Sequence, residues 1–468
     1  MKLPNDIAGL QALVLELLKR IDYLESEVKD LRGQIKADSS NSSRPPSSDG
    51  LKKKPAIPKG KPKNKGGQKG HKGKTLEMVE TPDFVVSLCP SECDCGTSLL
   101  EVERTCTEVR QVFDLPEPKL VVTEYQQQSC VCPDCKKTHL GKFPEGVAPN
   151  TQYGSGVRAL ITLLSVSYKI PYKKIKTIFT DLYGYGLNES TQIKTLQKCY
   201  DLLEDSEFEI RSQLQKSKVN HFDETGLRVA GKLHWLHTSS SQLYTYLFVH
   251  ENRGKKALDS SVSILPDYTG WAVHDCWASY FKFNRCQHSL CGAHLLRELQ
   301  ALIDQDSSWA KQMHQLLLDV YKQTEGGKSE LELTHFQKAS RKYSRICRKA
   351  DKEEPPPIIN PRGKPKRSKG RNLKNRLTKY KASVLAFAKY AYIPFTNNLA
   401  ERDVRHAKVK QKISGSFRTK DGADIYSRVY GYISTLRKHQ LQEVDPNINI
   451  FKELSAVFQR NSYSFLPL

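Results

Sequence analysis

The stretch His221-Phe-Asp-Glu-Thr-Gly-Leu-Arg-Val229 is a β-type run that carries an acidic side chain, Asp223, in its interior. The patterns before it are helical, so this run marks a change of local structure and is typical of a buried strand. Further strand-type runs follow at 232–241, 243–252 and 270–280, and a short helix is expected near 255–264.

Three successive strands, a helix and a fourth strand form the order of a ribonuclease-H-like fold, in which a central mixed sheet presents carboxylates on adjacent strands. The fourth run carries a second acid, Asp275, which we expect beside Asp223. A third acid, Glu401, begins a strongly helical segment.

Three carboxylates suit phosphoryl transfer. Two divalent cations about 3.5–4 Å apart activate an attacking oxygen and stabilise the leaving one. Magnesium is a hard ion that keeps several waters, so a few carboxylates and substrate phosphates complete its shell. We therefore predict that Asp223, Asp275 and Glu401 hold two Mg²⁺ (or Mn²⁺) ions.

Spacing alone leaves structural roles open for these acids. Asp223 and Asp275 could cap turns at strand ends, and Glu401, three residues after Asn398, could complete an arrangement like a capping box. Three other acids are reserve candidates for the site: Glu224, Glu298 and Asp403.

Basic residues follow Glu401 at helical spacing. Arg405, Lys408 and Lys412 fall on its face and could align phosphate near the metals, although a solvated basic face is the alternative. Arg402 is a further candidate for contact with nucleic acid.

Composition agrees with a polyanionic partner. The chain has 468 residues, enough for about three or four structural units, and a net charge of +23. This excess favours nucleic acid. We see neither a run of roughly 18 apolar residues nor a signal-peptide pattern, so we expect no membrane partner and a cytoplasmic protein.

The first segment, 1–38, carries apolar residues from Ile7 to Ile35 spaced alternately three and four apart. This seam predicts a coiled coil and a homo-oligomer, at least a dimer. An amphipathic helix packed on the protein's own core is the alternative.

The next segment, 39–80, is rich in Ser, Pro, Gly and Lys, and predicts a disordered linker. Ten lysines lie within residues 51–74. We expect them, Lys52, Lys53 and Lys54 included, to contact DNA phosphates rather than form a plain solvated linker.

The segment 81–148 holds seven of the 12 cysteines. In a reducing compartment, thiols clustered in this way are expected to bind metal rather than form disulfides. We predict a zinc-ribbon-like module with structural Zn²⁺ and strands over 108–115 and 120–127. The candidate ligands are Cys89, Cys93, Cys95, Cys132 and Cys135, with Cys130 or His139 as substitutes. Incidental thiols are the alternative.

The segment 149–216 is helical. A turn at Gly184 and Gly186 and an N-cap at Ser190 predict a helix that exposes Gln192, Lys194 and Lys198. This layout is that of a helix-turn-helix that binds DNA, and a plain helical packing module fits the pattern nearly as well.

Four motifs in this order resemble the transposases of the insertion sequence 66 family, a group of bacterial DDE transposases. They are DET at 223–225, D-x-W-x-x-Y at 275–280, C-x-x-H at 291–294 and N-N-x-x-E-R-x-x-R at 397–405. The zipper segment, NSSRPPSSD at 41–49, GGQKGHKG at 66–73 and the C-terminal Phe465-Leu-Pro-Leu468 extend the resemblance over nearly the whole chain. Cys93-Asp-Cys95 departs from a clean C-x-x-C.

The resemblance implies that Asp223, Asp275 and Glu401 are the catalytic triad and that His294 approaches the scissile phosphate. It implies a multidomain α+β chain, with a ribonuclease-H-like catalytic domain over 217–294 and 381–440, an α-helical insertion over 295–380 and a tail over 441–468. We expect insertion helices at 308–323 and 331–349 and a basic loop after them. A second zinc site from Cys286, His288, Cys291 and His294 is an alternative.

The function implied is that of a transposase that binds the terminal inverted repeats of its element, cuts, and joins the 3′ ends to target DNA, with helper proteins of the same element as potential partners. A non-catalytic, zinc-containing DNA-binding regulator is the second hypothesis. A structure-specific nuclease is the third.

Overall fold

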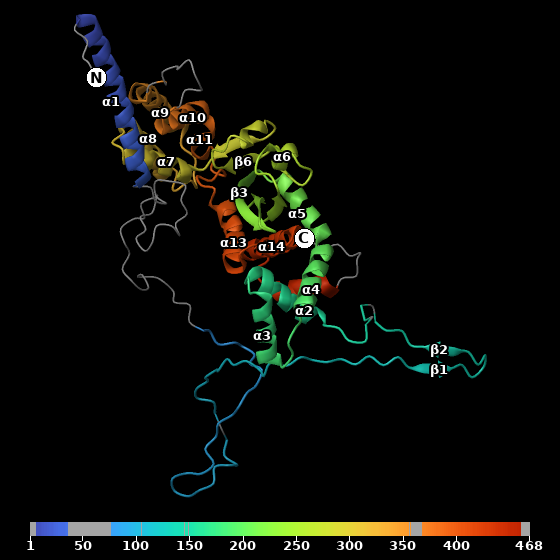
Figure 1. The fold of residues 1–468 in the computed structure, drawn as a ribbon. Helices are drawn as coiled ribbons and strands as arrows, with labels where there is room; N and C mark the ends of the chain where they lie inside the picture. The colour runs from blue at the N-terminus through green and yellow to red at the C-terminus, as the bar shows by residue number, and fades with distance from the viewer. Residues whose placement is uncertain are drawn as a thin grey trace.

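A computed structural model describes residues 6–35, 76–103, 105–144, 146–147, 149–354, 356 and 367–459. At its centre is a five-stranded sheet in the order β5-β4-β3-β6-β7, drawn in green and yellow in Figure 1. The strands are β3 (Val219–Val229), β4 (Lys232–Ser240), β5 (Thr245–His250), β6 (Trp271–His274) and β7 (Gln287–Leu290).

The sheet is mixed. Strands β3, β4 and β5 are antiparallel neighbours, whereas β6 runs parallel to β3 and β7 parallel to β6. The predicted order of three strands, a short helix (α6, Lys255–Leu258) and a fourth strand is confirmed. This α+β arrangement is consistent with a ribonuclease-H-like domain.

Two details of the sheet differ from the prediction. The fourth strand, β6, ends at His274, so Asp275 is the first residue beyond it. The structure also adds β7, because the four residues of that strand are too few to show a period in the sequence.

Helices from the C-terminal third cover the sheet. Helix α13 (Asn398–Ser414) packs on β3 and β4, and α14 (Lys420–Leu441) packs on β5 beside α5 (Glu204–Lys216). The main hydrophobic core lies between these helices and the strands. Residues near 400 and residues near 220 therefore belong to the same core, although they are far apart in the sequence.

The helical region before the sheet contains α2 (Ser155–Thr162), a π-helix η2 (Leu163–Ser167), α3 (Tyr172–Tyr183) and α4 (Glu189–Leu202). Gly184 ends α3 with φ +73°, as the predicted turn requires. The N-cap of α4 is Asn188, so the prediction of Ser190 was wrong by two residues.

Gln192 also corrects the prediction, because it is fully buried rather than exposed. Its side-chain amide donates to the carbonyls of Tyr172 and Leu187. Both carbonyls lie outside α4, and buried carbonyls need a hydrogen-bond donor. The glutamine side chain is long enough to reach them. Lys194 and Lys198 are exposed, as predicted.

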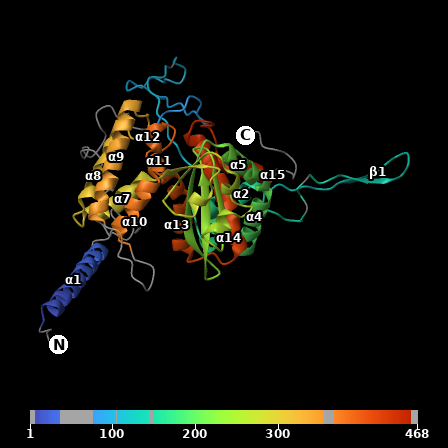
Figure 2. The same ribbon diagram turned by 90° about the horizontal axis from the view of Figure 1, so that it is seen from above.

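The insertion is a second helical unit with its own core, and Figure 2 shows α8, α9 and α10 to one side of the sheet, opposite α2, α4 and α15. Its helices are α7 (Gly292–Ile303), α8 (Ser308–Gln323), α9 (Leu333–Glu353), α10 (Lys369–Lys379), α11 (Lys381–Val384) and α12 (Ala386–Lys389). The predicted helices over 308–323 and 331–349 correspond to α8 and α9. Residues up to Phe395 pack into this core, beyond the expected boundary at 380.

The C-terminal segment is more than a tail. Helix α15 (Ile450–Gln459) packs against α2, and Leu454, Val457 and Phe458 enter the main core. Two 3₁₀ turns, η3 (Leu265–Asp267) and η4 (Tyr280–Lys282), complete the central domain.

The N-terminal segment forms helix α1 (Ile7–Ile35), and its apolar seam is exposed from Ile7 to Leu31. Self-association through this seam stays a prediction. Among the described residues, no helix is long and apolar enough to cross a membrane.

In the described part of the cysteine-rich segment, the strands are those of one short hairpin, β1 (Ser129–Val131) with β2 (Thr138–Leu140). The strands predicted over 108–115 and 120–127 do not form. Their apolar residues are exposed, with Val112 at 91 % and Val121 at 85 %. A strand needs a paired neighbour and a buried face, and this segment supplies neither.

Several predictions concern residues outside the described ranges. These are the linker up to residue 75 with Lys52, Lys53 and Lys54, most of the basic loop of the insertion, and the last nine residues.

Candidate active site

Two neighbouring parallel strands bring Asp223 and Asp275 to the same level of the sheet. His221 of β3 pairs with Val273 of β6. Two residues further along each strand, the same register leads to Asp223 and Asp275. Their positions therefore follow from one backbone register.

Asn397 fixes the start of α13 onto β3. Its side-chain amide donates to the carbonyl of Phe222 at 2.8 Å, and its Oδ1 lies 2.9 Å from Nδ1 of His221. Burial lowers the pKa of His221 to about 4, so the neutral ring donates to this oxygen. The two residues that precede Asp223 in β3 thus both contact Asn397, and Glu401 follows Asn397 by one helical turn.

The carboxylates affect one another electrostatically. The pKa of Asp223 is raised well above its usual value, first by burial and then by the negative charges of Glu224, Asp275 and Glu401. Burial also raises the pKa of Asp275. Ionising this group of acids is costly without cations, and hard divalent ions are the partners that carboxylate oxygens fit.

Glu401 has neighbours from the inserted helices. Its Oε1 is 3.6 Å from Nδ1 of His294 and 4.0 Å from Sγ of Cys291. Burial lowers the pKa of His294 to about 4, so this ring is neutral at pH 7 and the contact is not an ion pair. Arg405 lies one turn after Glu401, with Nη2 at 3.6 Å from its Oε2.

Cys291 contacts both Glu401 and Asn397. It is buried, and burial followed by the charge of Glu401 raises the pKa of its thiol to about 11. The sulfur accepts the backbone N–H of Asn397 at 3.2 Å. Cys291, His294 and Glu401 are also the single group of three His, Cys, Asp or Glu side chains in the described ranges whose ligand atoms gather within 4.8 Å.

The three reserve acids are each neutralised by a cation. Glu224 binds Arg253 at 2.7 Å, Glu298 binds Arg376, and Asp403 binds Lys438 at 3.1 Å. By contrast, Asp223 and Asp275 make no ion pair with any residue that the structure describes. The reserve acids therefore have their charges compensated. Of the three acids predicted for the site, Asp223 and Asp275 lack such compensation among the described residues, whereas Glu401 has Arg405 at 3.6 Å.

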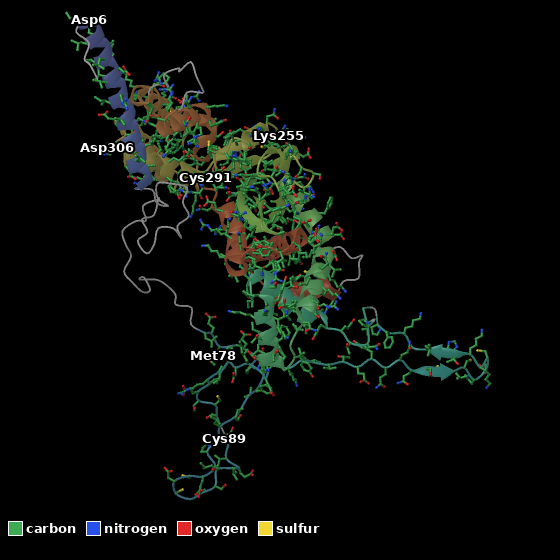
Figure 3. All side chains as sticks on the ribbon, viewed as in Figure 1. Asp6, Met78, Cys89, Lys255, Cys291 and Asp306 are labelled. Carbon is green, nitrogen blue, oxygen red and sulfur yellow. The ribbon has the colours of Figure 1, made fainter. Side chains whose placement is uncertain are left out.

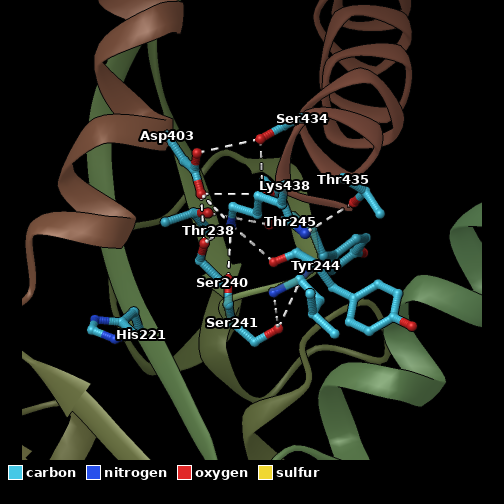
Figure 4. A network of polar contacts seen from close by, with 12 residues as sticks. His221, Thr238, Ser240, Ser241, Tyr244, Thr245, Asp403, Ser434, Thr435 and Lys438 are labelled. Atoms are coloured by element: carbon cyan, nitrogen blue, oxygen red, sulfur yellow. Dashed lines mark hydrogen bonds and ion pairs between the residues drawn. The ribbon is translucent and has the colours of Figure 1, made fainter. Parts of the chain in front are cut away.

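The Asp403 carboxylate has several hydrogen-bond partners in addition to its cation. It accepts from Ser240, Thr245 and Lys438 between β4, β5 and α14, as Figure 4 shows. A buried charge with this many partners is satisfied, and it fixes α13 against the sheet two residues after Glu401.

Sequence reasoning missed the group around Glu224. Arg253 lies between the rings of Trp235 and Trp277, at 4.9 and 4.6 Å from their centroids. Tyr280 donates to the other oxygen of Glu224. The signal was present in the sequence, since Trp277 and Tyr280 are the conspicuous residues of the D-x-W-x-x-Y run that Asp275 begins.

The zinc candidates form two separate local pairs. Hydrogen bonds from Thr97, then Cys93, lower the pKa of Cys95 to about 7, and contacts with Cys135 and Asp134 lower the pKa of Cys132. Figure 3 labels Cys89 on a loop that lies apart from the β1–β2 hairpin. In residues 76–103 and 105–144, no three of these ligands come within zinc-binding distance of one another.

The alternative second zinc site is not assembled either. Cys286 and His288 contact each other and the carbonyl of Phe283, whereas Cys291 and His294 face Glu401. The four side chains therefore belong to two different places.

The predicted basic residues of α13 differ in their surroundings. Arg402, Arg405 and Lys412 are exposed. Lys408 donates to the carbonyl of Gly226 in β3, so it also fastens the helix to the sheet.

Comparison with known proteins agrees with this geometry. The family model described as "Transposase IS66 family" matches residues 150–425, more than half of the chain and the whole central sheet. A second model, described as a family of unknown function (DUF6444), matches residues 2–77. No curated protein matches the chain.

Proposed function

Because the chain belongs to the IS66 transposase family, whose members are DDE-type polynucleotidyl transferases acting in DNA transposition, we propose that Asp223, Asp275 and Glu401 are its catalytic carboxylates. One observation carries this assignment. Among the acids around the site, Asp223 and Asp275 lack a cationic partner in the described residues, and after burial the charges of Glu224, Asp275 and Glu401 raise the pKa of Asp223.

We propose that these three residues hold the divalent cations that the family uses. When bound, such cations supply activation of the attacking oxygen and stabilisation of the leaving one. The protein's own contribution is position. Asn397 and the β3–β6 register hold the acids together, and exposed Arg402 and Arg405 lie where a phosphate diester would meet α13.

The reaction then has two steps. In the first, a water loses a proton as its oxygen bonds to phosphorus at the end of the element, the bond from phosphorus to the 3′ oxygen breaks, and that leaving oxygen takes up a proton to become a hydroxyl. In the second, this hydroxyl loses its proton as its oxygen bonds to a phosphorus of target DNA, and the 3′ oxygen of the target leaves and takes up a proton. No net oxidation or reduction occurs.

His294 has a supporting role in this proposal. Its neutral ring lies beside Glu401, and its Nδ1 has no hydrogen-bond partner among the described residues. It is therefore available to donate to, or accept from, a group of the DNA at the scissile phosphate.

We also propose binding of the terminal inverted repeats by the α3–α4 region, with Lys194 and Lys198 toward DNA, and structural Zn²⁺ in the cysteine-rich segment. The local pairs Cys93–Cys95 and Cys132–Cys135 support the zinc proposal, since two such pairs brought together complete a tetrahedral site. Metal analysis of purified protein, with Cys132→Ser as the comparison, tests it.

The test of the catalytic proposal uses purified protein, end DNA of the element, target DNA and Mg²⁺. Asp223→Ala, Asp275→Ala and Glu401→Ala should each reduce cleavage and joining by at least about 10³-fold, as loss of a metal-binding group in phosphoryl transfer does. Asp259→Asn is the control, because Asp259 pairs with Lys255 at the surface.

Each alternative predicts a different result. A DNA-binding regulator would bind the ends and cut nothing with Mg²⁺ or Mn²⁺. A nuclease would hydrolyse DNA without joining. If the three alanine variants cut and join as well as the parent, the assignment of the carboxylates is wrong.

A further inference from the structure

A cluster of basic side chains lies outside the carboxylate site, where the segment after η2 meets α13 and α14. It consists of Lys169, Lys410 and Arg437, with His406 beside them, and we call it the basic cluster. In Figure 1, α13 and α14 lie next to the α2–α3 region. Direct contacts join the three segments there.

The partners of the basic cluster are all neutral. Lys169 donates to the carbonyl of Ser167 at 2.8 Å and to Nδ1 of His406 at 3.0 Å. Lys410 donates to the carbonyl of Ser165 at 3.2 Å, and Arg437 donates to the hydroxyl of Ser167. None of the three cations forms an ion pair within the described ranges.

This arrangement is costly for the protein alone. Lys169 is only 7 % exposed, and burial and the charge of Arg437 lower its pKa. Burial and the charge of Lys169 lower the pKa of Lys410 to about 8. Lys410 and Arg437 are half-buried. Cations that are removed from water and repel one another are normally compensated by an anion.

No acid of the described chain fills that role. Asp403 is the one carboxylate that acts on His406, and it is already bonded to Lys438, Ser240 and Thr245. Lys169 uses two of its three N–H donors in these contacts, Lys410 uses one of three and Arg437 uses one of five, so each cation keeps at least one donor for an anion.

The backbone carries a second cost at the same place. Lys169 has φ +62°, a left-handed conformation that is unfavourable for a residue with a side chain. It lies two residues after the end of the π-helix, a distortion that proteins often keep at functional sites. With this backbone conformation, the Lys169 ammonium points toward side chains of α13 and α14, namely His406 and Tyr430.

We infer that Lys169, Lys410 and Arg437 bind one backbone phosphate of DNA. The inference rests on the proposed function, because that function supplies the DNA. One further observation favours a DNA phosphate over another anion. Helix α3 next to the cluster carries exposed Lys173, Lys174 and Lys176, which extend the positive charge beyond a single phosphate.

The experiment measures affinity for end DNA as a function of salt concentration by fluorescence anisotropy. Lys410→Gln and Arg437→Gln should each weaken binding and lower the slope of log K against log salt by about 0.9, the value for one lost phosphate contact. Lys338→Gln, which removes an exposed charge from α9, is the control and should leave the slope unchanged.

A second arm uses inorganic phosphate as the probe. Phosphate, compared with chloride at equal ionic strength, should raise the melting temperature of the parent, and Lys169→Met should remove this effect. Stabilisation by phosphate with unchanged DNA salt slopes would overturn the DNA assignment in favour of a free phosphate site. Folded variants that match the parent in both arms would overturn the site itself.

Failure of this inference can be told apart from failure of the proposed function. Asp223→Ala leaves the basic cluster intact, so its salt slope should equal that of the parent while cleavage is lost. Cleavage that depends on the carboxylates together with unaltered slopes in Lys410→Gln and Arg437→Gln would reject only the phosphate contact.

Discussion

At the scale of single residues, the acids in and around the candidate site differ in whether a cation compensates their charge. Glu224, Glu298 and Asp403 are paired with Arg253, Arg376 and Lys438. Asp223 and Asp275 have no such partner among the described residues, and burial makes their ionisation costly. Buried acids whose ionisation is unfavourable are found most often at functional sites.

Asp223→Asn should therefore stabilise the metal-free protein while it abolishes cleavage. The pKa of Asp223 is raised in the folded state, so the folded state keeps a proton that the unfolded chain has lost. Between about pH 4 and the raised pKa, stability should fall as pH rises. Removing the charge should raise the melting temperature at pH 7 by about 2 °C or more, measured by calorimetry with a chelator present.

Mg²⁺ provides the control for that prediction. It should raise the melting temperature of the parent and have little effect on Asp223→Asn, because the variant lacks one ligand. A variant that is less stable than the parent at pH 7 without metal, yet folded, would contradict the electrostatic explanation.

At the scale of elements, the joint between α7 and the start of α13 places Glu401. Gly292 at the start of α7 donates its backbone N–H to the carbonyl of Phe395 at 2.8 Å, and Cys291 accepts from Asn397. A Cβ at Gly292 would lie 2.2 Å from the ring of Phe395. Only glycine allows this close approach, so the inserted helices and α13 are held together at this point.

Gly292→Ala should consequently push the start of α7 away from Phe395. We expect a loss of about 1–3 kcal/mol in the free energy of unfolding, as for overpacking of a core, and a larger fractional loss of DNA cleavage. Urea unfolding and the cleavage assay measure the two effects. Gly254→Ala is the matched control, since nothing lies within 4 Å of a Cβ there and its φ of −84° suits alanine.

The joint has only a structural role if Gly292→Ala lowers stability but leaves the cleavage rate per folded molecule unchanged. That outcome would show that Glu401 reaches its place without help from α7.

At the scale of the whole molecule, α1 presents an apolar seam that the described chain leaves exposed, with Leu24 at 53 % and Val28 at 45 %. A 29-residue helix with heptad spacing gains stability mainly by pairing with another helix. We expect a second copy of the chain to cover it.

Leu24→Lys should therefore shift the protein toward monomer, because a charge in the seam is desolvated on pairing. Sedimentation velocity across a concentration series measures the change. Gln11→Lys adds the same charge off the seam and should leave the oligomer intact. A parent that sediments as a monomer at micromolar concentration would contradict the expected dimer.

Much of the fold was predictable because it depends on local patterns. The strand run at 221–229, the insertion helices and the helix that begins near Glu401 each carry a clear period, and a short motif accompanies each acid. The cysteine-rich segment was not predictable in this way. Its strand-like composition has no partner strand in the structure, and propensity without a partner does not make a sheet.

The sequence by itself determined which residues are candidates for chemistry and in what order the strands and helices follow one another. Only the tertiary structure decided which acids remain unpaired, since Arg253, Arg376 and Lys438 are distant in sequence from the acids that they neutralise. It likewise decided that Asn397 attaches α13 to β3, 175 residues away. Local periodicity encodes elements, whereas charge compensation depends on which elements pack together.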